Sequence, residues 1–173
     1  DCAVQGLIVS QMTNPGRVIS ITGLSGSGKT TLAKALQKEL PGPILLDGDE
    51  LREALGSANH GFDVESRKKL AKTYARLAGL LARQGFIVLV ATISLFHDLH
   101  AWNRENLPNY LEVFLDVPEE ERRRRDPKGL YAANVPNMAG KQTKAEFPEQ
   151  PHLRLDGSQG FGEAVEAVMK FFA

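Results

Sequence analysis

One stretch of the sequence carries residue types at a spacing that suits phosphate chemistry. Residues 23–30, Gly-Leu-Ser-Gly-Ser-Gly-Lys-Thr, match the pattern G-x-x-x-x-G-K-[ST] at every fixed position. Glycines allow the backbone to curl so that successive N–H groups point inward at phosphate oxygens. In such a loop Lys29 reaches the β- and γ-phosphates, and the hydroxyl of Thr30 ligates Mg²⁺. The alternative, a glycine-rich turn that binds nothing, explains neither the lysine nor the threonine.

The segments on either side of this loop are those that phosphate binding requires. Residues Arg17–Thr22 are apolar enough to form a buried strand, and Lys29–Leu40 show the spacing of a helix with one apolar face. A helix that begins at the loop directs its positive N-terminal end at the phosphates. The sequence therefore predicts a nucleoside triphosphate site built from Gly23, Ser25, Gly26, Ser27, Gly28, Lys29, Thr30 and Thr31.

Short apolar runs and helical patterns alternate along the rest of the chain. The predicted strands are Pro43–Leu46, Phe86–Ala91, Leu111–Leu115 and, at the edge, His152–Leu155; the predicted helices are Glu65–Arg83, 98–106, Glu119–Arg125 and Phe161–Phe172. Such alternation is typical of an α/β fold, a doubly wound parallel sheet with helices on both faces. Sheets of this kind bind ligands beyond the carboxyl ends of their strands.

The pattern divides the chain into a short tail and one domain. Residues 1–16 show no clear period, and we expect them to be a tail or linker outside the domain at 17–173. Residues 126–151 are rich in proline, glycine and polar side chains and fit neither period. A long loop of this kind in a compact domain is either a functional lid or a disordered stretch, so we predict a lid at about 126–151.

Composition excludes several classes of protein. Among 173 residues, 21 Lys and Arg balance 21 Asp and Glu, which argues against a general nucleic-acid binder. The lone Cys2 cannot form an internal disulfide, and the four histidines lack the spacing of a zinc site. No apolar run approaches the ~20 residues of a membrane span. We therefore expect a cytoplasmic protein.

Two carboxylates follow the second predicted strand, at Asp47-Gly48-Asp49. Beside a phosphate loop, one carboxylate can lie near Mg²⁺ while the other accepts the proton of an attacking hydroxyl. A turn that uses Asp and Gly for local hydrogen bonds explains the same residues equally well. The chain lacks the Asn-Lys-x-Asp signature of a GTPase and is too short for a motor or transporter ATPase. A small phosphoryl-transfer enzyme fits its length.

Four segments together resemble the adenylylsulfate (APS) kinase family: GLSGSGKTTLA, LDGDELR, the pair Gly61-Phe62 followed by Arg67, and RDPKGLY at Arg125–Tyr131. The resemblance covers roughly residues 17–172. It implies a P-loop kinase that uses ATP and Mg²⁺ to phosphorylate the 3′-hydroxyl of adenylylsulfate. It also implies a homodimer, in some members fused to or beside a sulfurylase or nucleotidyltransferase.

The resemblance assigns roles on the phosphate side of the site. Lys29 is expected to stabilise the transferred group, and Asp49 to act as the base or to orient the acceptor hydroxyl. Asp47 corresponds to the neighbour on the Mg²⁺ side. Arg125 and Lys128 resemble the lid residues that close over phosphates. For Arg122 and Arg123 in the same run, a solvated helix face is the expected position.

On the acceptor side, Arg52 and Arg67 resemble the arginines that hold the anionic group of the acceptor nucleotide. Phe62 resembles the aromatic residue that stacks on its base. Ile93 and Ser94 stand where backbone and side-chain contacts to the acceptor are expected. Arg67 lies one turn before the apolar stripe of the long helix, so that face should lead into the cleft.

The departures from the family pattern fall in the acceptor region. Leu95 and His97 stand where the family has Pro and Arg, Leu70 where it has Asn, and Met138 where it has an aromatic Phe. Loss of one stacking partner costs about 1–3 kcal/mol of binding. These positions leave room for two alternatives to APS kinase: a non-catalytic nucleotide-binding module, and a member of the branch described next.

The sequence SLF at 94–96, followed by Trp-Asn-Arg at 102–104, resembles a divergent branch that includes a cytidine diphosphoramidate kinase of capsule modification. Arg104 either replaces the missing arginine or lies on a helix surface, and Trp102 is expected to pack in the protein interior.

Overall fold

The computed structural model describes residues 16–56, 61–126, 128–133, 138–139 and 144–172. Within these residues the strands form a parallel sheet in the order β2-β3-β1-β4-β5. The strands are β1 (Arg17–Gly23), β2 (Ile44–Asp47), β3 (Ile87–Ala91), β4 (Leu111–Leu115) and β5 (Leu153–Leu155). The predicted parallel sheet, including the edge position of the last strand, is confirmed. Strand ends differ from the prediction by one residue at most, as in β1, which continues to Gly23.

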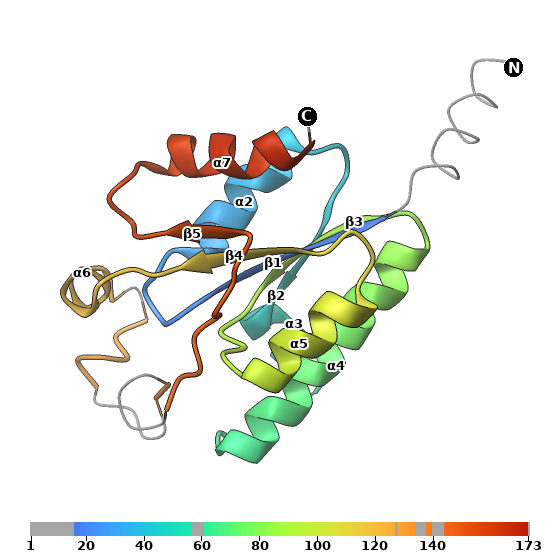
Figure 1. Cartoon of the computed structure of the whole chain (residues 1–173). Helices are drawn as coiled ribbons and strands as arrows, with labels where there is room; N and C mark the ends of the chain where they lie inside the picture. Colours follow the sequence, from blue (N-terminus) through green and yellow to red (C-terminus); the bar gives the residue numbers. More distant parts are fainter. Residues whose placement is uncertain (1–15, 57–60, 127, 134–137, 140–143, 173) are drawn as a thin grey trace, which may run out of the picture.

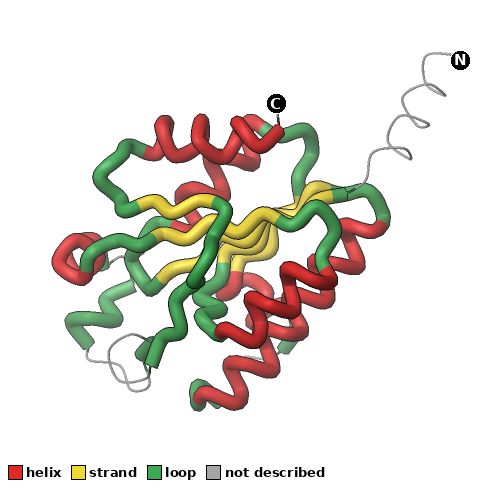
Figure 2. The backbone as a smooth tube through the Cα atoms, viewed as in Figure 1, coloured by secondary structure: helices red, strands yellow, loops and turns green. Residues whose placement is uncertain are grey.

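The helices cover both faces of the sheet, as predicted. They are α2 (Lys29–Glu39), α3 (Gly48–Ala54), α4 (Val64–Arg83), α5 (His97–Asn106), α6 (Glu119–Arg125) and α7 (Phe161–Met169), with a 3₁₀ turn η2 (Lys170–Phe172). Helices α2 and α7 lie on one face, and α4 and α5 on the other (Figures 1 and 2). The C-terminal pattern predicted as one helix thus ends in a tighter 3₁₀ turn, as helix ends often do.

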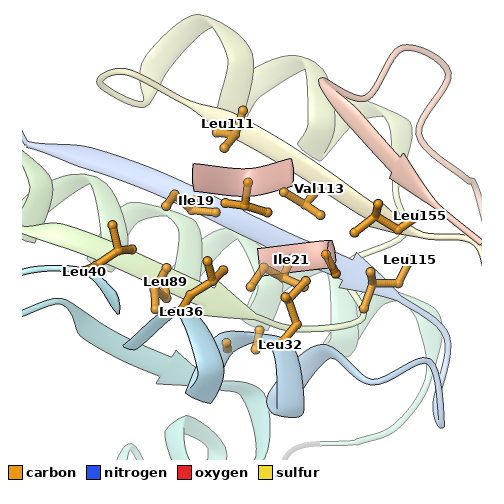
Figure 3. Packing of buried hydrophobic residues seen from close by; sticks show 14 of the residues in the cluster. Ile19, Ile21, Leu32, Leu36, Leu40, Leu89, Leu111, Val113, Leu115 and Leu155 are labelled. Carbon is orange, nitrogen blue, oxygen red and sulfur yellow. The ribbon is translucent and has the colours of Figure 1, made fainter. Parts of the chain in front are cut away.

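One half of the core lies between the sheet and the helices α2 and α7 (Figure 3). Ile19, Ile21 and Leu89 project from the sheet toward Leu32 and Leu36 of α2, and all five side chains are fully buried. Three- and four-residue spacing places the α2 leucines on one helix face, and period-two spacing places Ile19 and Ile21 on one sheet face. This packing fixes α2, and therefore its N-terminus, against β1.

The opposite face of the sheet packs against α4. Val18 on β1 and Val88 on β3 are also fully buried. Each directly precedes a residue of the first half of the core, so its side chain points to the other face of the sheet, toward Ala78 and Ala82. Alanines on the buried side of α4 allow the helix to approach the strands closely. Because β3 is covered on both faces, its sequence is continuously apolar rather than alternating. Strand β1 is buried in the same way, although it includes the small polar residues Ser20 and Thr22.

Helix α3 was not predicted, because the run Asp-Gly-Asp-Glu is also typical of a turn. Its N-cap is Asp47, whose carboxylate accepts a hydrogen bond from the backbone N–H of Asp49 at 3.1 Å. This contact satisfies one of the helix-end donors that have no partner within the helix. The cap therefore starts a helix at the end of β2 and sets the direction of Asp49.

Parts of the predicted tail and lid lie outside the described residues, including 1–15 and 134–137. In the described part of the lid, the carboxylate of Asp126 accepts backbone N–H groups of Tyr131 and Ala132 at 3.2 and 3.1 Å. These bonds form a compact turn directly after α6. Among the described helices, none has the length and apolar character needed to cross a membrane.

The packing of α2 leads to a prediction about stability. Leu36→Ala removes a fully buried side chain between α2 and the sheet, and we expect it to lower the free energy of unfolding by about 2–5 kcal/mol. Leu80→Ala, at a residue of α4 that is 50% exposed, is the matched control and should change it by about 0.5 kcal/mol or less. Urea denaturation of both variants measures the difference, and equal losses would contradict the assigned core.

Candidate active site

The loops that follow β1, β2 and β3 border one cavity of about 710 Å³ at the carboxyl ends of the strands. All but two of the predicted site residues line it: Ser25, Gly26, Gly28, Lys29, Thr30, Thr31, Asp47, Asp49, Arg52, Phe62, Arg67, Ile93, Ser94, Arg125 and Lys128. Residues separated by about 100 positions in the sequence thus meet at one place. The exceptions are Gly23 and Ser27, which do not line the cavity.

The glycines of the phosphate loop are required by its shape. Gly26 and Gly28 have φ angles of 79° and 96°, in the left-handed region that side chains disfavour. A Cβ on Gly26 would lie 2.7 Å from the carbonyl oxygen of Arg122. Gly23 is needed for packing, because its Cβ would lie 2.7 Å from the hydroxyl of Ser27, itself only 3% exposed.

Lys29 extends back beneath the loop that it follows. Its ammonium donates a hydrogen bond to the carbonyl oxygen of Leu24 at 2.9 Å. The pKa of Lys29 is lowered to about 8, mainly by burial of the charged end and also by the charge of Lys128, whereas Asp47 and Asp49 oppose the shift. The ammonium is therefore held in a place where negative phosphate oxygens would stabilise its charge.

Asp47 connects the phosphate loop to the end of β2. The hydroxyl of Thr30 donates a hydrogen bond to its carboxylate at 2.6 Å, and Asp47 is 7% exposed. Hydroxyl and carboxylate oxygens are ligands that Mg²⁺ accepts, with the remaining ligands supplied by phosphates and water. Among the described residues no three His, Cys, Asp or Glu converge on a metal position. The pair therefore fits a metal ion that arrives with a nucleotide.

Asp49 is two residues further along and faces the open cavity. Its carboxylate forms an ion pair with the ammonium of Lys128, from the turn after α6. Both side chains are more than half exposed, so the pair contributes little to stability. It shows that Lys128 of the lid region can reach the carboxylate predicted to receive the acceptor hydroxyl.

The far end of the cavity holds the residues predicted to bind an acceptor. The guanidinium of Arg52 lies 4.6 Å from the ring centre of Phe62, and the side chain of Phe62 is 59% exposed. Arg67 lines the cavity from the first turns of α4, as the helix pattern predicted, followed one turn later by Leu70. This half thus combines two guanidinium groups with an accessible aromatic ring and an apolar wall.

Phe161 is a cavity residue that the sequence reasoning missed. It begins α7, and a Cβ on Gly28 would lie 3.0 Å from its ring and 3.6 Å from the guanidinium of Arg125. A flat apolar ring and a guanidinium therefore flank the phosphate loop. The available signal was an aromatic residue just after Gly160, beyond the carboxyl end of the last strand, where ligands bind in such sheets.

Arg122 was predicted on a solvated face, and that prediction is wrong. The residue is 7% exposed and donates to the carbonyl of Val117 at 2.9 Å and to the hydroxyl of Tyr131. That hydroxyl in turn donates to the carbonyl oxygen of Ser25 at 3.2 Å. Arg122 thus holds the turn of the lid against the phosphate loop. Arg123 is exposed and paired with Glu119, as a solvated position predicts.

Arg104 neither lines the cavity nor lies free on the helix surface. It donates to the buried carboxylate of Glu112 and to the carbonyl oxygen of Gln150, each at 2.9 Å. The possibility that it replaces the missing acceptor arginine is therefore wrong for this conformation. Trp102 packs against two clusters of buried residues, as predicted.

Comparisons with known proteins agree with this arrangement. The family profile described as adenylylsulphate kinase matches residues 15–156. The chain belongs to the adenylylsulphate kinase family. It is 37% identical over 172 residues to a cytidine diphosphoramidate kinase of Campylobacter jejuni, covering 94% of this chain and 99% of that protein. It is 44% identical over 151 residues to an adenylyl-sulfate kinase of Deinococcus deserti, covering 82% of this chain and 83% of that protein.

The fold of this member of the adenylylsulphate kinase family matches solved relatives. The structure of the Mycobacterium tuberculosis APS kinase in complex with AMPPNP and APS superposes with a TM-score of 0.85 at 32% identity, covering 92% of this chain and 98% of the other. The predicted P-loop kinase fold is confirmed, and so is the predicted class, a kinase that uses ATP and phosphorylates a hydroxyl group.

The buried ammonium of Lys29 leads to a pH prediction. Its native pKa of about 8 lies below the ordinary value of 10.5, so between these pH values the unfolded chain binds a proton that the native protein has lost. The unfolding free energy of the wild type should therefore rise between pH 7 and pH 10 relative to that of Lys29→Met, by about 2–3 kcal/mol. Denaturation at pH 7, 8.5 and 10 measures the difference, and a constant difference would contradict burial of the charge.

Proposed function

We propose that the chain transfers the γ-phosphoryl group of Mg²⁺-bound ATP to the ribose 3′-hydroxyl of a small nucleotide, with adenylylsulfate as its acceptor. The observation that supports this best is the continuity of the cavity. Thr30 of the phosphate loop contacts Asp47, and Asp49 follows two residues later. Arg52 is one turn further along α3, beside Phe62, and it lines the same cavity. A donor and an acceptor would therefore meet at Asp49.

On the donor side, the N–H groups of residues 23–31 and the ammonium of Lys29 bind the phosphates. The ring of Phe161 and the guanidinium of Arg125, both next to Gly28, offer surfaces for the base of ATP. Thr30 and Asp47 would hold Mg²⁺, which supplies positive charge to the β- and γ-phosphates. Ser27 and Gly23 contribute by shaping the loop.

The transfer step assigns each charged group a separate task. The 3′-oxygen forms a bond to the γ-phosphorus while the bond from that phosphorus to the β-phosphate oxygen breaks, and ADP leaves. The carboxylate of Asp49 orients the hydroxyl and receives its proton. Lys29 and Lys128 stabilise the charge that spreads over the transferred oxygens. Binding of phosphates by Lys128 would release Asp49 from the ion pair seen in the structure.

On the acceptor side, Arg52 and Arg67 bind the anionic group of the nucleotide, Phe62 stacks on its base, and the turn at Ile93 and Ser94 supports it. An aromatic ring stacked on a base contributes about 1–3 kcal/mol. The anhydride between phosphate and sulfate in adenylylsulfate carries the negative charge that two guanidinium groups suit.

A second acceptor, cytidine diphosphoramidate, is favoured by one specific observation. The acceptor half is lined by Leu70, Leu95 and Met138 at positions where polar, proline or aromatic residues stand in the family pattern. A relative that matches over 99% of its length is named as a kinase for that compound. A smaller pyrimidine base tolerates a looser stacking site. The homodimer, the cytoplasmic location and any fusion to a sulfurylase or nucleotidyltransferase stay predictions.

Asp49 carries the clearest prediction for catalysis. We expect Asp49→Asn to lower kcat by about 10²- to 10⁴-fold, because the carboxylate that accepts the hydroxyl proton is lost. The dissociation constant for Mg²⁺-ATP should change less than about threefold, since the substitution leaves in place every residue assigned to that ligand. Glu50→Gln, an exposed neighbour on α3 that does not line the cavity, is the matched control. Undiminished turnover by Asp49→Asn would remove Asp49 from the mechanism.

The acceptor is tested by measuring ADP release with each candidate in parallel. We expect turnover of adenylylsulfate, and we expect Leu70→Asn to raise kcat/KM for it about fivefold if a polar contact is restored. Leu80→Asn on the exposed side of α4 serves as the control. Turnover of cytidine diphosphoramidate alone would replace the proposed acceptor, and ATP binding without turnover of either compound would indicate a non-catalytic module.

A further inference from the structure

The turn between β3 and α5, residues 92–96, forms part of the acceptor wall. All five residues line the cavity. Ser94 has a φ angle of 41°, in the left-handed region that few residues other than glycine adopt. Such a conformation costs free energy and persists only where neighbouring contacts hold it. The shape of the acceptor wall therefore depends on what holds Ser94.

Two contacts from outside the cavity, and one within the turn itself, hold this turn. Nε2 of His100 lies 2.8 Å from the carbonyl oxygen of Ser94, and the Ser94 hydroxyl lies 2.6 Å from that of Thr92. The hydroxyl of Thr22 on β1 donates to the carbonyl oxygen of Ile93. His100 is only 6% exposed and does not itself line the cavity. It acts from behind the wall, from the second turn of α5.

The contacts of His100 define its protonation. A carbonyl oxygen only accepts hydrogen bonds, so Nε2 must carry a proton. Nδ1 is buried and has no hydrogen-bond partner among the described residues. Burial also lowers the pKa of His100, which favours the neutral ring. His100 is therefore a neutral, fixed donor. Its hydrogen bond goes to the carbonyl group of Ser94, the residue of the turn with a left-handed backbone.

We propose that His100 is a positioning residue for the acceptor: its Nε2–H group fixes the Ser94 carbonyl and so maintains the wall formed by residues 92–96. This inference rests on the proposed function, since it assumes that the nucleotide acceptor occupies that half of the cavity. The ATP half is built by the phosphate loop, α6 and Phe161, which His100 does not contact. Loss of the bond should therefore affect the two substrates unequally.

The test compares two amides with an apolar variant. Gln carries its side-chain N–H at about the reach of Nε2, whereas the shorter Asn carries it near the position of Nδ1. We expect His100→Leu and His100→Asn to lower kcat/KM for the acceptor about 5- to 20-fold, mainly through KM, while KM for ATP changes less than twofold. We expect His100→Gln to retain most of the wild-type value.

The matched control is His152→Leu. The ring of His152 also bonds to backbone, accepting the N–H of Glu112 at 2.9 Å, but it lies outside the cavity. It should leave both KM values unchanged. Equal losses for ATP and acceptor, or a His100→Gln variant as poor as His100→Asn, would overturn the proposal. If His100→Leu fails to fold, comparing kcat/KM of His100→Gln and His100→Asn still tests whether a donor at the position of Nε2 is needed.

A structural measurement separates this proposal from the proposed function. If the wild type phosphorylates neither adenylylsulfate nor cytidine diphosphoramidate, the proposed function fails, but the role of His100 is still measurable. Crystal structures of the wild type, His100→Gln and His100→Asn should show a positive φ at Ser94 in the first two and its loss in the third. A positive φ that persists in His100→Asn would show that His100 does not maintain the turn.

Discussion

The register of the parallel sheet determines where every candidate functional residue lies. The last residues of β2 and β3, Asp47 and Ala91, are paired with each other, and so are the last residues of β1 and β4, Gly23 and Leu115. Ala91 is also paired with Ile21, two residues before the end of β1, so neighbouring strands end within two residues of one another. The chain segments that leave these ends must therefore lie side by side at one edge. A slip of one residue would turn the apolar set of a strand to the opposite face, so the buried core on both sides holds this register. Core packing thus positions the site without contributing a side chain to it.

Burying positive charge at the phosphate loop lowers the stability of the ligand-free protein. An ammonium beneath the loop, near the charge of Lys128, is less stable than an exposed one, as the lowered pKa of Lys29 indicates. Arg122 brings a further positive charge close by, but it is engaged with Val117 and Tyr131. The ligand-free protein therefore concentrates positive charge that polyphosphate would neutralise. Stability without ligand is lowered in favour of affinity for ATP, a common compromise at functional sites.

Sequence patterns predicted the strands and the phosphate loop because both follow from local rules. The period-two and continuous apolar runs determine burial, and the loop needs glycine, lysine and threonine at fixed spacing. Helix α3 was missed because its start depends on one side-chain cap, Asp47, in a run that also suits a turn. Arg122 was placed wrongly because helix periodicity alone does not reveal that Tyr131 and Val117 surround it. Phe161 was missed because its meeting with Gly28 is a tertiary contact across 133 residues of chain.

The sequence departs from the family pattern in the acceptor wall. There the turn at residues 92–96 and the start of α5 are held by hydrogen bonds from two sides. From behind, His100 binds the carbonyl of Ser94. From the lid side, the backbone N–H of Glu146 donates to the carbonyl of Leu95 at 3.2 Å, and the Glu146 carboxylate accepts the N–H of His97 at 3.0 Å. Without the proline and arginine of the family pattern, the turn is held by hydrogen bonds to its own backbone. Because those bonds come from His100 on α5 and from Glu146 in the C-terminal part of the predicted lid, neither of which lines the cavity, changes outside the cavity can alter which nucleotide the cavity accepts.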